Sequence, residues 1–386
     1  MIKNKNLFRT IAILILLSVF FFLFTNQDGL IQSILGEKTE SSSARLVSTI
    51  NIDELKFPEP TELSSSTSSH AKLQNEYHSW VAYWDHIGAI DSIQKNPNVL
   101  KSISPSWYKV NADGSVSLKS AKSQSLADIA RSQNMKIIPS ISNSSPDELS
   151  EIIANEANTN NHISKILREV TANDYDGIDI DYEHINSFDK DNFTNFIRKL
   201  SEELNKIDRK LTIAILWKAD PVELIEGFSD SRAAQDWVEI GKAVDEFRIM
   251  AYDFTHSYNA QGPIAPDYWI EEILKYAILN VDKSKIVLGL PWYAYEWAEG
   301  SQKATALVFN DIKNLKDNYP ESIISDEISK GEKKLDYDGV NGKMTIWYQD
   351  SKVTQDRIDL ANKYGVNKII FWRLGGEDYS FWKARN

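Results

Sequence analysis

The sequence predicts an α/β fold, a (β/α)₈ TIM barrel, on the basis of three observations. Eight short apolar runs rich in β-forming residues follow one another along the chain, and segments of helical period lie between most of them. The 386 residues, 42% of them hydrophobic, suffice for one barrel of roughly 250 residues with accessory segments. This alternation indicates parallel pairing and a closed barrel, with a doubly wound open sheet as the structural alternative.

The strands and the clearest helices can be placed along the chain. The eight strands are expected at residues 80–84, 99–103, 136–141, 177–183, 210–216, 246–252, 285–290 and 368–372. Helices are expected at residues 189–207, 233–244, 269–279 and 354–364, and Gly365 caps the last of them.

Two segments depart from the simple alternation. Residues 107–118 contain Asp113-Gly114 between alternating residues, which predicts a hairpin after the second strand. Residues 298–348, between strands seven and eight, are expected to form a small insertion that makes one wall of a cleft. This insertion contains another expected hairpin, with Asp-Gly and Asn-Gly at its turn.

Residues 1–31 are expected to form a hydrophobic helix that serves as a signal peptide or a membrane anchor. Three basic residues precede an apolar run at 11–24 that only Ser18 interrupts. No small-x-small cleavage site follows at 25–29, which favours an uncleaved anchor, while a buried core helix is the alternative. Because the basic flank stays inside, the rest of the chain is expected outside the cytoplasm, anchored to the cell membrane or secreted.

The remaining chain divides into a linker and a barrel domain. Residues 32–70 are polar and rich in Ser, Thr and Pro, which is typical of a disordered linker. Residues 71–386 then form the barrel, which is expected to be monomeric. The 55 acidic against 43 basic residues give a net charge of −12, which disfavours nucleic acid as a partner. The absence of cysteine excludes disulfides, thiolate metal ligands and cysteine nucleophiles.

The fourth expected strand carries three acids on one face. Because side chains alternate along a strand, Asp179, Asp181 and Glu183 project to one side at steps of roughly 6.6 Å, and Ile178 and Ile180 face the other. Acids aimed into a barrel interior are costly unless they share protons and hydrogen bonds. They also lie at the C-terminal end of the strand, where barrel enzymes carry their catalytic residues.

Neighbouring carboxylates repel one another and raise at least one pKa, so an acid here can stay protonated near neutral pH. Glu183, the longest and the last on the strand, is the expected proton donor, and Asp181 can share a proton with Asp179. A solvated acidic turn and a divalent-metal site are the alternatives, because hard cations also gather carboxylates at this spacing. His184 and His256 are expected to be polar residues on the rim rather than ligands.

Residues 176–183, Asp-Gly-Ile-Asp-Ile-Asp-Tyr-Glu, resemble the DGxDxDxE signature of glycoside hydrolase family 18, the chitinase family. Three further segments agree in order and spacing: Met-Ala-Tyr-Asp at 250–253, Leu-Gly-Leu-Pro-Trp-Tyr at 288–293 and Phe-Trp-Arg-Leu-Gly at 371–375. The resemblance covers roughly residues 77–383. Within the family, the sequence looks most like bacterial cell-wall and spore-cortex N-acetylglucosaminidases.

The resemblance implies a retaining glycosidase without metal or cofactor, in which the 2-acetamido oxygen of the substrate attacks the anomeric carbon. By position, Glu183 would be the acid and base, Asp181 would orient the acetamido group and Asp179 would support Asp181. The other residues implied are Tyr252 on the acetamido oxygen, Asp253 on sugar hydroxyls, Trp372 as stacking floor, Met250 at the pocket base and Tyr293 as a wall residue. Four further tryptophans fall near strand ends and are expected either to pack or to line outer subsites, Trp292 being counted among the substrate-binding residues: Trp84, Trp107, Trp217 and Trp292.

The expected substrate is a β-linked polysaccharide that contains N-acetylglucosamine, of the peptidoglycan or chitin type, with N-glycans left open. The N-terminal helix is expected to contact the membrane. Two other functions are kept: a catalytically weak or silent, lectin-like member of the same family, and a metal-dependent hydrolase built on the same acids. The presence of Glu183 counts against the lectin, and sensitivity to a chelator would identify the metal enzyme.

Overall fold

The computed structural model describes residues 74–219, 230–340, 342–383 and 385, all of which belong to one unit, His70–Asn386. The expected hydrophobic helix at 1–31 and the linker at 32–70 lie outside the described residues. Within the described part of the chain, no helix combines the length and the apolar character that crossing a bilayer requires.

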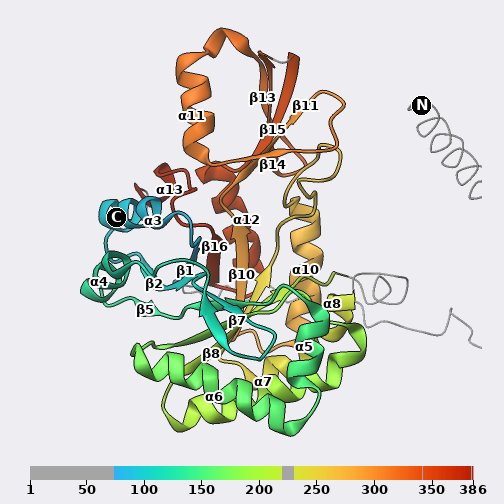
Figure 1. Ribbon diagram of the computed structural model, residues 1–386. Helices are drawn as coiled ribbons and strands as arrows, with labels where there is room; N and C mark the ends of the chain where they lie inside the picture. Colours follow the sequence, from blue (N-terminus) through green and yellow to red (C-terminus); the bar gives the residue numbers. More distant parts are fainter. Residues whose placement is uncertain (1–73, 220–229, 341, 384, 386) are drawn as a thin grey trace, which may run out of the picture. The chain divides into compact units, whose positions relative to one another are not determined.

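The centre of the fold is a ring of parallel strands (Figure 1). Strands β7, β8, β9, β10, β16, β1 and β2 are successive neighbours in the sheet. The segment with β5 and β6 closes the ring, because β5 pairs with β2 and β6 pairs with β7. The strands are β1 (Glu76–Val81), β2 (Leu100–Pro105), β5 (Lys136–Ile137), β6 (Ser140–Ser142), β7 (Gly177–Asp181), β8 (Lys210–Leu216), β9 (Glu246–Met250), β10 (Ile286–Pro291) and β16 (Lys368–Trp372). The architecture is therefore that of an α/β barrel.

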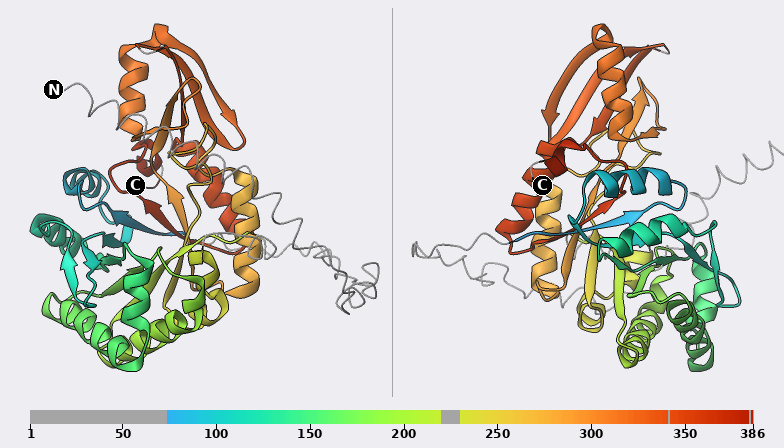
Figure 2. Two further views of the ribbon diagram at one scale, coloured as in Figure 1. Left: turned by 45° about the vertical axis from the view of Figure 1, so that its right-hand side comes forward. Right: turned by 90° about the vertical axis from the view of Figure 1, so that its left-hand side faces the viewer.

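Helices cover the outside of the ring (Figure 2). Most begin at a residue whose side chain accepts a hydrogen bond from the first turn, such as Asp85, Ser145 and Asp350. Their apolar faces pack against the strands in one large core. The helices are α3 (His86–Lys95), α4 (Gln124–Ser132), α5 (Pro146–Ile153), α6 (Glu156–Ala172), α7 (Lys190–Lys206), α8 (Asp230–Ala234), α9 (Trp237–Ala243), α10 (Asp267–Asn280), α12 (Ser351–Lys363) and α13 (Ser380–Lys383).

Three differences between the expected and the observed strand boundaries bear on the fold. The first strand is β1 at 76–81 rather than 80–84, because its pairing with β16 and β2 runs through the polar start of the segment. The third strand is divided, since Pro139 has no N–H to donate and separates β5 from β6. The fourth strand ends at Asp181, so Glu183 lies just beyond the ladder.

The hairpin expected at 107–118 is present as β3 (Tyr108–Val110) and β4 (Val116–Leu118). Gly114 at its turn has a φ of +72°, a conformation that glycine adopts without strain. The hairpin is more than an appendage, because β3 also pairs in parallel with β6 and so extends the barrel sheet. The buried His162 of α6 holds the turn of this hairpin, because its Nδ1 lies 2.7 Å from the Gly114 carbonyl oxygen.

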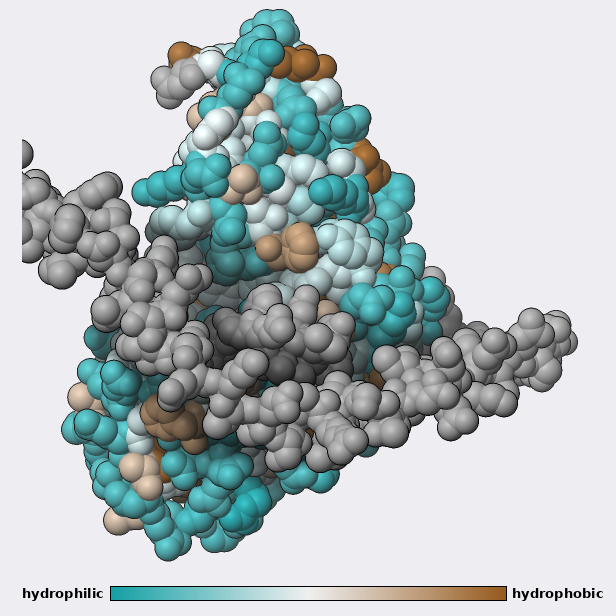
Figure 3. Space-filling model, turned by 90° about the vertical axis from the view of Figure 1, so that its right-hand side faces the viewer, coloured by the Kyte–Doolittle hydropathy of each residue, from teal (hydrophilic) through white to brown (hydrophobic). Residues whose placement is uncertain are grey.

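A second sheet lies between β10 and β16 in the sequence and has the strand order β12-β11-β15-β14-β13. It has its own small core, which includes Ile312, Leu335 and Ile346. Among the residues coloured in Figure 3, hydrophilic ones predominate and hydrophobic ones form only small, separate patches. Its elements are β11 (Ala294–Ala298), β12 (Thr305–Leu307), α11 (Phe309–Asn318), β13 (Ile323–Ser329), β14 (Glu332–Gly339) and β15 (Gly342–Tyr348).

The buried carboxylate of Glu332 joins this second sheet to the barrel. It accepts hydrogen bonds from the backbone N–H groups of Ile264 and Ala265, at 2.6 and 3.2 Å, and from the Gln349 side chain. The guanidinium Nη2 of Arg357, on α12, lies 3.7 Å from Glu332 Oε1, and both side chains are almost fully buried. The start of β14 is thereby held against the loop after β9 and against α12.

Replacement of Glu332 by Ala is expected to lower the free energy of unfolding by about 3–5 kcal/mol. The change leaves the buried Arg357 charge with only the partly exposed Asp267 at 3.5 Å, and it removes the acceptor of two buried backbone N–H groups. Urea denaturation of the full-length chain measures this difference. The matched control is Glu327→Ala on the exposed face of β13, which is expected to change stability by less than about 0.5 kcal/mol. Equal effects of the two substitutions would show that Glu332 does not join the two sheets.

Candidate active site

Asp179 lies at the centre of the barrel with no exposed surface. Its Oδ2 accepts a hydrogen bond from the indole N–H of Trp80 at 2.9 Å, and its Oδ1 accepts one from the Thr212 hydroxyl at 2.5 Å. The guanidinium Nη1 of Arg248, equally buried, lies 3.3 Å from the same Oδ1. These partners compensate the solvation that a buried carboxylate loses.

Arg248 extends this contact into a network beneath the barrel mouth. Its guanidinium donates to the Ser104 hydroxyl at 2.6 Å and to the Glu246 carboxylate at 2.7 Å. Burial alone would raise the pKa of Glu246, but the charges of Arg248 and His78 outweigh it and lower that pKa to about 2. Arg248 is therefore a cation held between carboxylates of two strands.

Sequence reasoning missed Trp80, Thr212 and Arg248 as partners of Asp179. One signal was available, since Arg248 lies between Phe247 and Ile249 in an otherwise apolar strand. A cation in a strand that is buried on both faces requires a nearby anion.

Asp181 ends the strand one step beyond Asp179, and Glu183 follows just past the strand end. Burial raises the pKa of Asp181 well above its usual range, and the charges of Glu183 and Asp179 add to this effect. The Glu183 side chain reaches solvent, but the surrounding walls exclude much of the water, and this desolvation raises its pKa as well. The two carboxyls interact closely enough for each to shift the pKa of the other, so the pair can hold one proton between them.

Tyr182 faces away from the acids, toward the helices. Its hydroxyl lies 2.7 Å from Nε2 of His162, and its ring stacks on Phe196 at 5.9 Å. Burial lowers the pKa of His162 to about 4, so the ring is neutral at ordinary pH. The Gly114 carbonyl can only accept, so Nδ1 donates to it and Nε2 accepts a hydrogen bond from the Tyr182 hydroxyl. This chain fixes the strand that presents the acids.

Tyr252 and Asp253 follow β9 and face the same mouth. Burial raises the pKa of Tyr252 far above its usual range, and the charges of Glu183 and Asp181 raise it further. The hydroxyl therefore keeps its proton. Asp253 has a φ of +60° and accepts hydrogen bonds from the hydroxyls of Tyr293 and Tyr295, the latter at 3.1 Å. The second sheet thus supplies Tyr295, which sequence reasoning did not anticipate.

Aromatic rings form the floor and one side of the mouth. Trp372 packs edge-on against Trp80 and Trp84, with ring centroids 6.4 and 6.2 Å apart. Met250 lies below in the barrel interior, in contact with the cluster that includes Tyr252 and Trp372. A cavity of about 320 Å³ opens beside these rings. It is lined by Trp84, Asp253, Tyr293, Tyr295, Ala306, Leu307, Val308, Asp311, Trp372 and Arg373.

The structure does not bring Trp292 to this mouth, which corrects its assignment as a substrate-binding residue. Trp292 is 3% exposed and stacks on Phe371 with ring centroids 3.6 Å apart. Tyr293 lines the cavity while Trp292 packs in the core, so the side chains of these neighbours face different ways. Trp107 is also buried, whereas Trp84, with 59% of its surface exposed, lines the cavity.

The first acid of the motif, Asp176, has a structural role outside the mouth. Its carboxylate accepts a hydrogen bond at 2.8 Å from the backbone N–H of Ile137. Gly177 follows it because a Cβ there would lie 2.3 Å from the Lys210 carbonyl oxygen. Both residues allow β7 to approach its neighbouring strands closely.

The hydrogen-bond donors around the acids leave no suitable site for a metal cation. Asp179 already binds three donors, and the Arg248 guanidinium beside it repels a metal ion. In the residues that the structure describes, no group of three or more His, Cys, Asp or Glu side chains is arranged to hold a metal. His256 lies on the rim, with Nδ1 3.7 Å from Asp253, and is mostly exposed.

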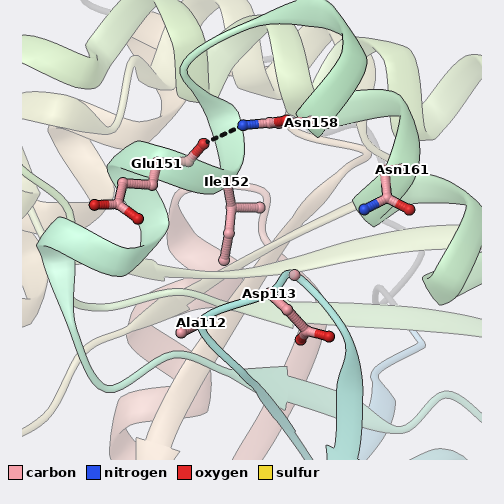
Figure 4. A pocket seen from close by; sticks show the side chains of 7 residues that line it. Ala112, Asp113, Glu151, Ile152, Asn158 and Asn161 are labelled. Atoms are coloured by element: carbon pink, nitrogen blue, oxygen red, sulfur yellow. Dashed lines mark hydrogen bonds between the residues drawn. The ribbon is translucent and has the colours of Figure 1, made fainter.

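A second cavity, of about 210 Å³, lies beside the turn of the β3–β4 hairpin (Figure 4). Asn158 closes one side by donating to the Glu151 carbonyl oxygen at 2.9 Å. None of the residues expected to act on a substrate lines this cavity. Its lining is Ala112, Asp113, Gly114, Glu151, Ile152, Asn158 and Asn161.

The geometry of the mouth is suited to proton transfer next to an aromatic binding surface. Asp181 and Glu183 share a hydrogen bond, so one proton can pass between them. A tyrosine hydroxyl and a second carboxylate can position a polar ligand, and the rings of Trp372 and Trp84 present flat faces.

Comparison with known proteins gives a consistent result. The model of glycosyl hydrolases family 18 matches residues 79–377. The uncharacterized glycosylase YvbX of Bacillus subtilis is 26% identical over 62% of this chain and 68% of its own length. The cortical fragment-lytic enzyme of the same organism is 22% identical over 65% of this chain, and the match spans only 59% of that enzyme.

Solved structures share the fold at low identity. A chitinase from Chromobacterium violaceum superposes with a TM-score of 0.71 at 21% identity, over 80% of this chain and 97% of that one. The spore cortex-lytic enzyme SleL of Bacillus megaterium superposes with a TM-score of 0.72 at 20% identity, over 82% of this chain and 74% of that one.

The opposite orientations of Trp292 and Tyr293 can be tested by stability. Trp292→Ala is expected to lower the free energy of unfolding by about 3–5 kcal/mol, because it opens a cavity in the core. Tyr293→Phe keeps the ring, removes one hydrogen bond to Asp253, and is expected to cost about 0.5–1.5 kcal/mol. Denaturation curves of both variants measure the difference. A loss below about 1 kcal/mol for Trp292→Ala would place that side chain at the surface.

Proposed function

The chain belongs to glycosyl hydrolases family 18 and is a glycosidase, and on this premise we propose that it cleaves β-linked N-acetylglucosamine-containing glycans with retention of configuration. The observation that carries the proposal is the pair of acids at the barrel mouth. Asp181 and Glu183 share a hydrogen bond, and both have raised pKa values. One proton is therefore held where a glycosidic oxygen can receive it.

In the proposed first step, the proton moves from Asp181 to Glu183, and Glu183 donates it to the leaving glycosidic oxygen. The 2-acetamido oxygen of the substrate attacks the anomeric carbon and forms an oxazolinium intermediate. Asp181, now a carboxylate, accepts a hydrogen bond from the acetamido N–H and stabilises the positive charge. Asp179 is held by Trp80, Thr212 and Arg248, which keeps its charge close behind Asp181.

In the proposed second step, Glu183 takes a proton from water, which attacks the same carbon and opens the oxazolinium ring. The two inversions together retain the configuration. Tyr252 keeps its proton and can donate it to the acetamido oxygen, since burial and the neighbouring acids raise its pKa. Asp253 contacts sugar hydroxyls, and Trp372 forms the floor under the reacting sugar.

We propose a bacterial cell-wall glycan as the substrate. The names of two relatives, a cortical fragment-lytic enzyme and a spore cortex-lytic enzyme, support this choice, while the chitinase among the similar structures keeps chitin as an alternative. The basic and apolar N-terminal segment supports a location outside the cytoplasm, at the membrane. The lectin-like alternative is less favoured, because the acid pair is present.

Replacement of Glu183 by Gln is expected to lower kcat by about 10²–10⁴-fold, because the amide cannot donate the proton. Hydrolysis of peptidoglycan strands and of N-acetylglucosamine oligomers by the full-length chain measures this loss, and product analysis identifies the polymer. The variant is expected to keep binding a thiazoline mimic of the oxazolinium ion.

The matched control is Glu321→Gln, an exposed acid away from the mouth, which is expected to keep wild-type activity. Undiminished hydrolysis by Glu183→Gln would contradict the acid assignment. Binding of both polymers without hydrolysis by the wild-type chain would instead support the lectin-like alternative.

The pH dependence follows from the raised pKa values. The site needs one proton on the Asp181–Glu183 pair, so kcat/KM is expected to fall as the pH rises through the apparent pKa of the pair. Because burial raises both values, this fall should lie above pH 4.5, the ordinary value for a glutamic acid. A pH–rate profile measures it. A fall centred at or below pH 4.5 would contradict the assignment.

A further inference from the structure

Lys119 ends the β3–β4 hairpin and places an ammonium group near the acids. Its backbone N–H donates to the Trp107 carbonyl oxygen at 2.7 Å, which fixes the end of the hairpin. Its Nζ donates to the Ser106 hydroxyl at 3.1 Å. Ser106 is itself held by a backbone hydrogen bond to Val81, at the end of β1. The amine is thus positioned from three elements over the ends of β1 and β2.

The charge of Lys119 has no carboxylate in direct contact, unlike those of two nearby lysines. Lys122 lies 3.9 Å from Glu169, and Lys165 lies 3.9 Å from Asp113. No ion pair found in the described part of the chain includes Lys119, whose hydrogen-bond partner is a neutral hydroxyl. An ammonium group has three donors, so two remain for a ligand.

Without a bound anion, the charge of Lys119 makes it harder for Asp181 and Glu183 to keep a proton. The groups that face Lys119 are the acids Asp181 and Glu183, the Ser106 hydroxyl and the ring of Tyr83, 5.6 Å from Nζ. Its positive charge lowers the pKa of both acids, against the burial that raises them. An anion bound to Lys119 removes this effect, whereas a neutral glycan leaves it in place.

A row of aromatic rings leads from the reacting sugar to Lys119. Trp372 contacts Trp84, and Trp84 contacts Tyr83 with ring centroids 4.8 Å apart. Trp84 and Tyr83 are 59% and 37% exposed, so their faces are open to a ligand. A glycan that stacks along this row places a neighbouring sugar beside the amine.

We propose that Lys119 binds a carboxylate on a sugar adjacent to the cleaved bond, so the chain prefers anionic N-acetylhexosamine strands over neutral ones. Ether-linked lactyl groups, as in peptidoglycan strands, carry such a carboxylate. The inference rests on the proposed function and adds the charge of its substrate. At a net charge of −12, the chain repels an anionic polymer at long range, and Lys119 compensates this locally.

The test compares peptidoglycan strands without peptides with the same strands after conversion of their carboxylates to methylamides. The full-length wild-type chain is expected to have about tenfold higher kcat/KM on the anionic strands, because a charge-assisted hydrogen bond is formed only with them. Lys119→Met should remove this preference through a higher KM, and Lys119→Arg should restore most of it. Added salt should weaken only the wild-type reaction on anionic strands.

The matched control is Lys109→Met, an exposed lysine on β3 of the same hairpin, which is expected to keep the preference. Equal loss on both substrates in Lys119→Met, or no preference in the wild type, would overturn the inference and leave the proposed function intact. If the wild type hydrolyses neither substrate, both fail. Should Lys119→Met not fold, the wild-type preference, its salt dependence and Lys119→Arg decide the question.

Discussion

The buried ion pair between Asp179 and Arg248 is the contact on which the acid cluster depends. Both side chains are fully buried, and the pair gains further donors from Trp80 and Thr212. A second acid can be placed one step along the strand because the first has its charge compensated. Although paired with Arg248, Asp179 still raises the pKa of Asp181, which favours a proton on Asp181 and so acid chemistry at the mouth.

The rest of the mouth is arranged around this centre by strand alternation. One face of β7 presents the acids, and the other face is fixed through Tyr182 to the helix layer. The ends of β9 and β16 add a tyrosine, an acid and a tryptophan, and the second sheet adds Tyr295. The cavity therefore combines residues from the barrel with residues from the second sheet and its α11 helix.

The sequence was sufficient for the α/β fold and for the relative orientation of the three acids, because both follow from period-two and helical patterns. It was insufficient for contacts between strands distant in sequence, such as Trp80 with Asp179. The prediction that Trp292 binds substrate was wrong, because the order of residues in a motif does not tell which side chains turn into the core. Lys119 was missed because its position depends on a three-dimensional hairpin rather than on a pattern.

The neutral ring of His162 has a consequence for engineering this barrel. It accepts a hydrogen bond from the Tyr182 hydroxyl, next to the acids in the sequence, and donates one to the Gly114 carbonyl oxygen at the hairpin turn. One side chain on α6 therefore links the hairpin turn to the acidic strand. A hairpin exchanged for that of another barrel would lose this second link to the acidic strand, beside the pairing of β3 with β6, unless a histidine and a matching turn carbonyl were transferred with it. The exchangeable module therefore includes part of α6.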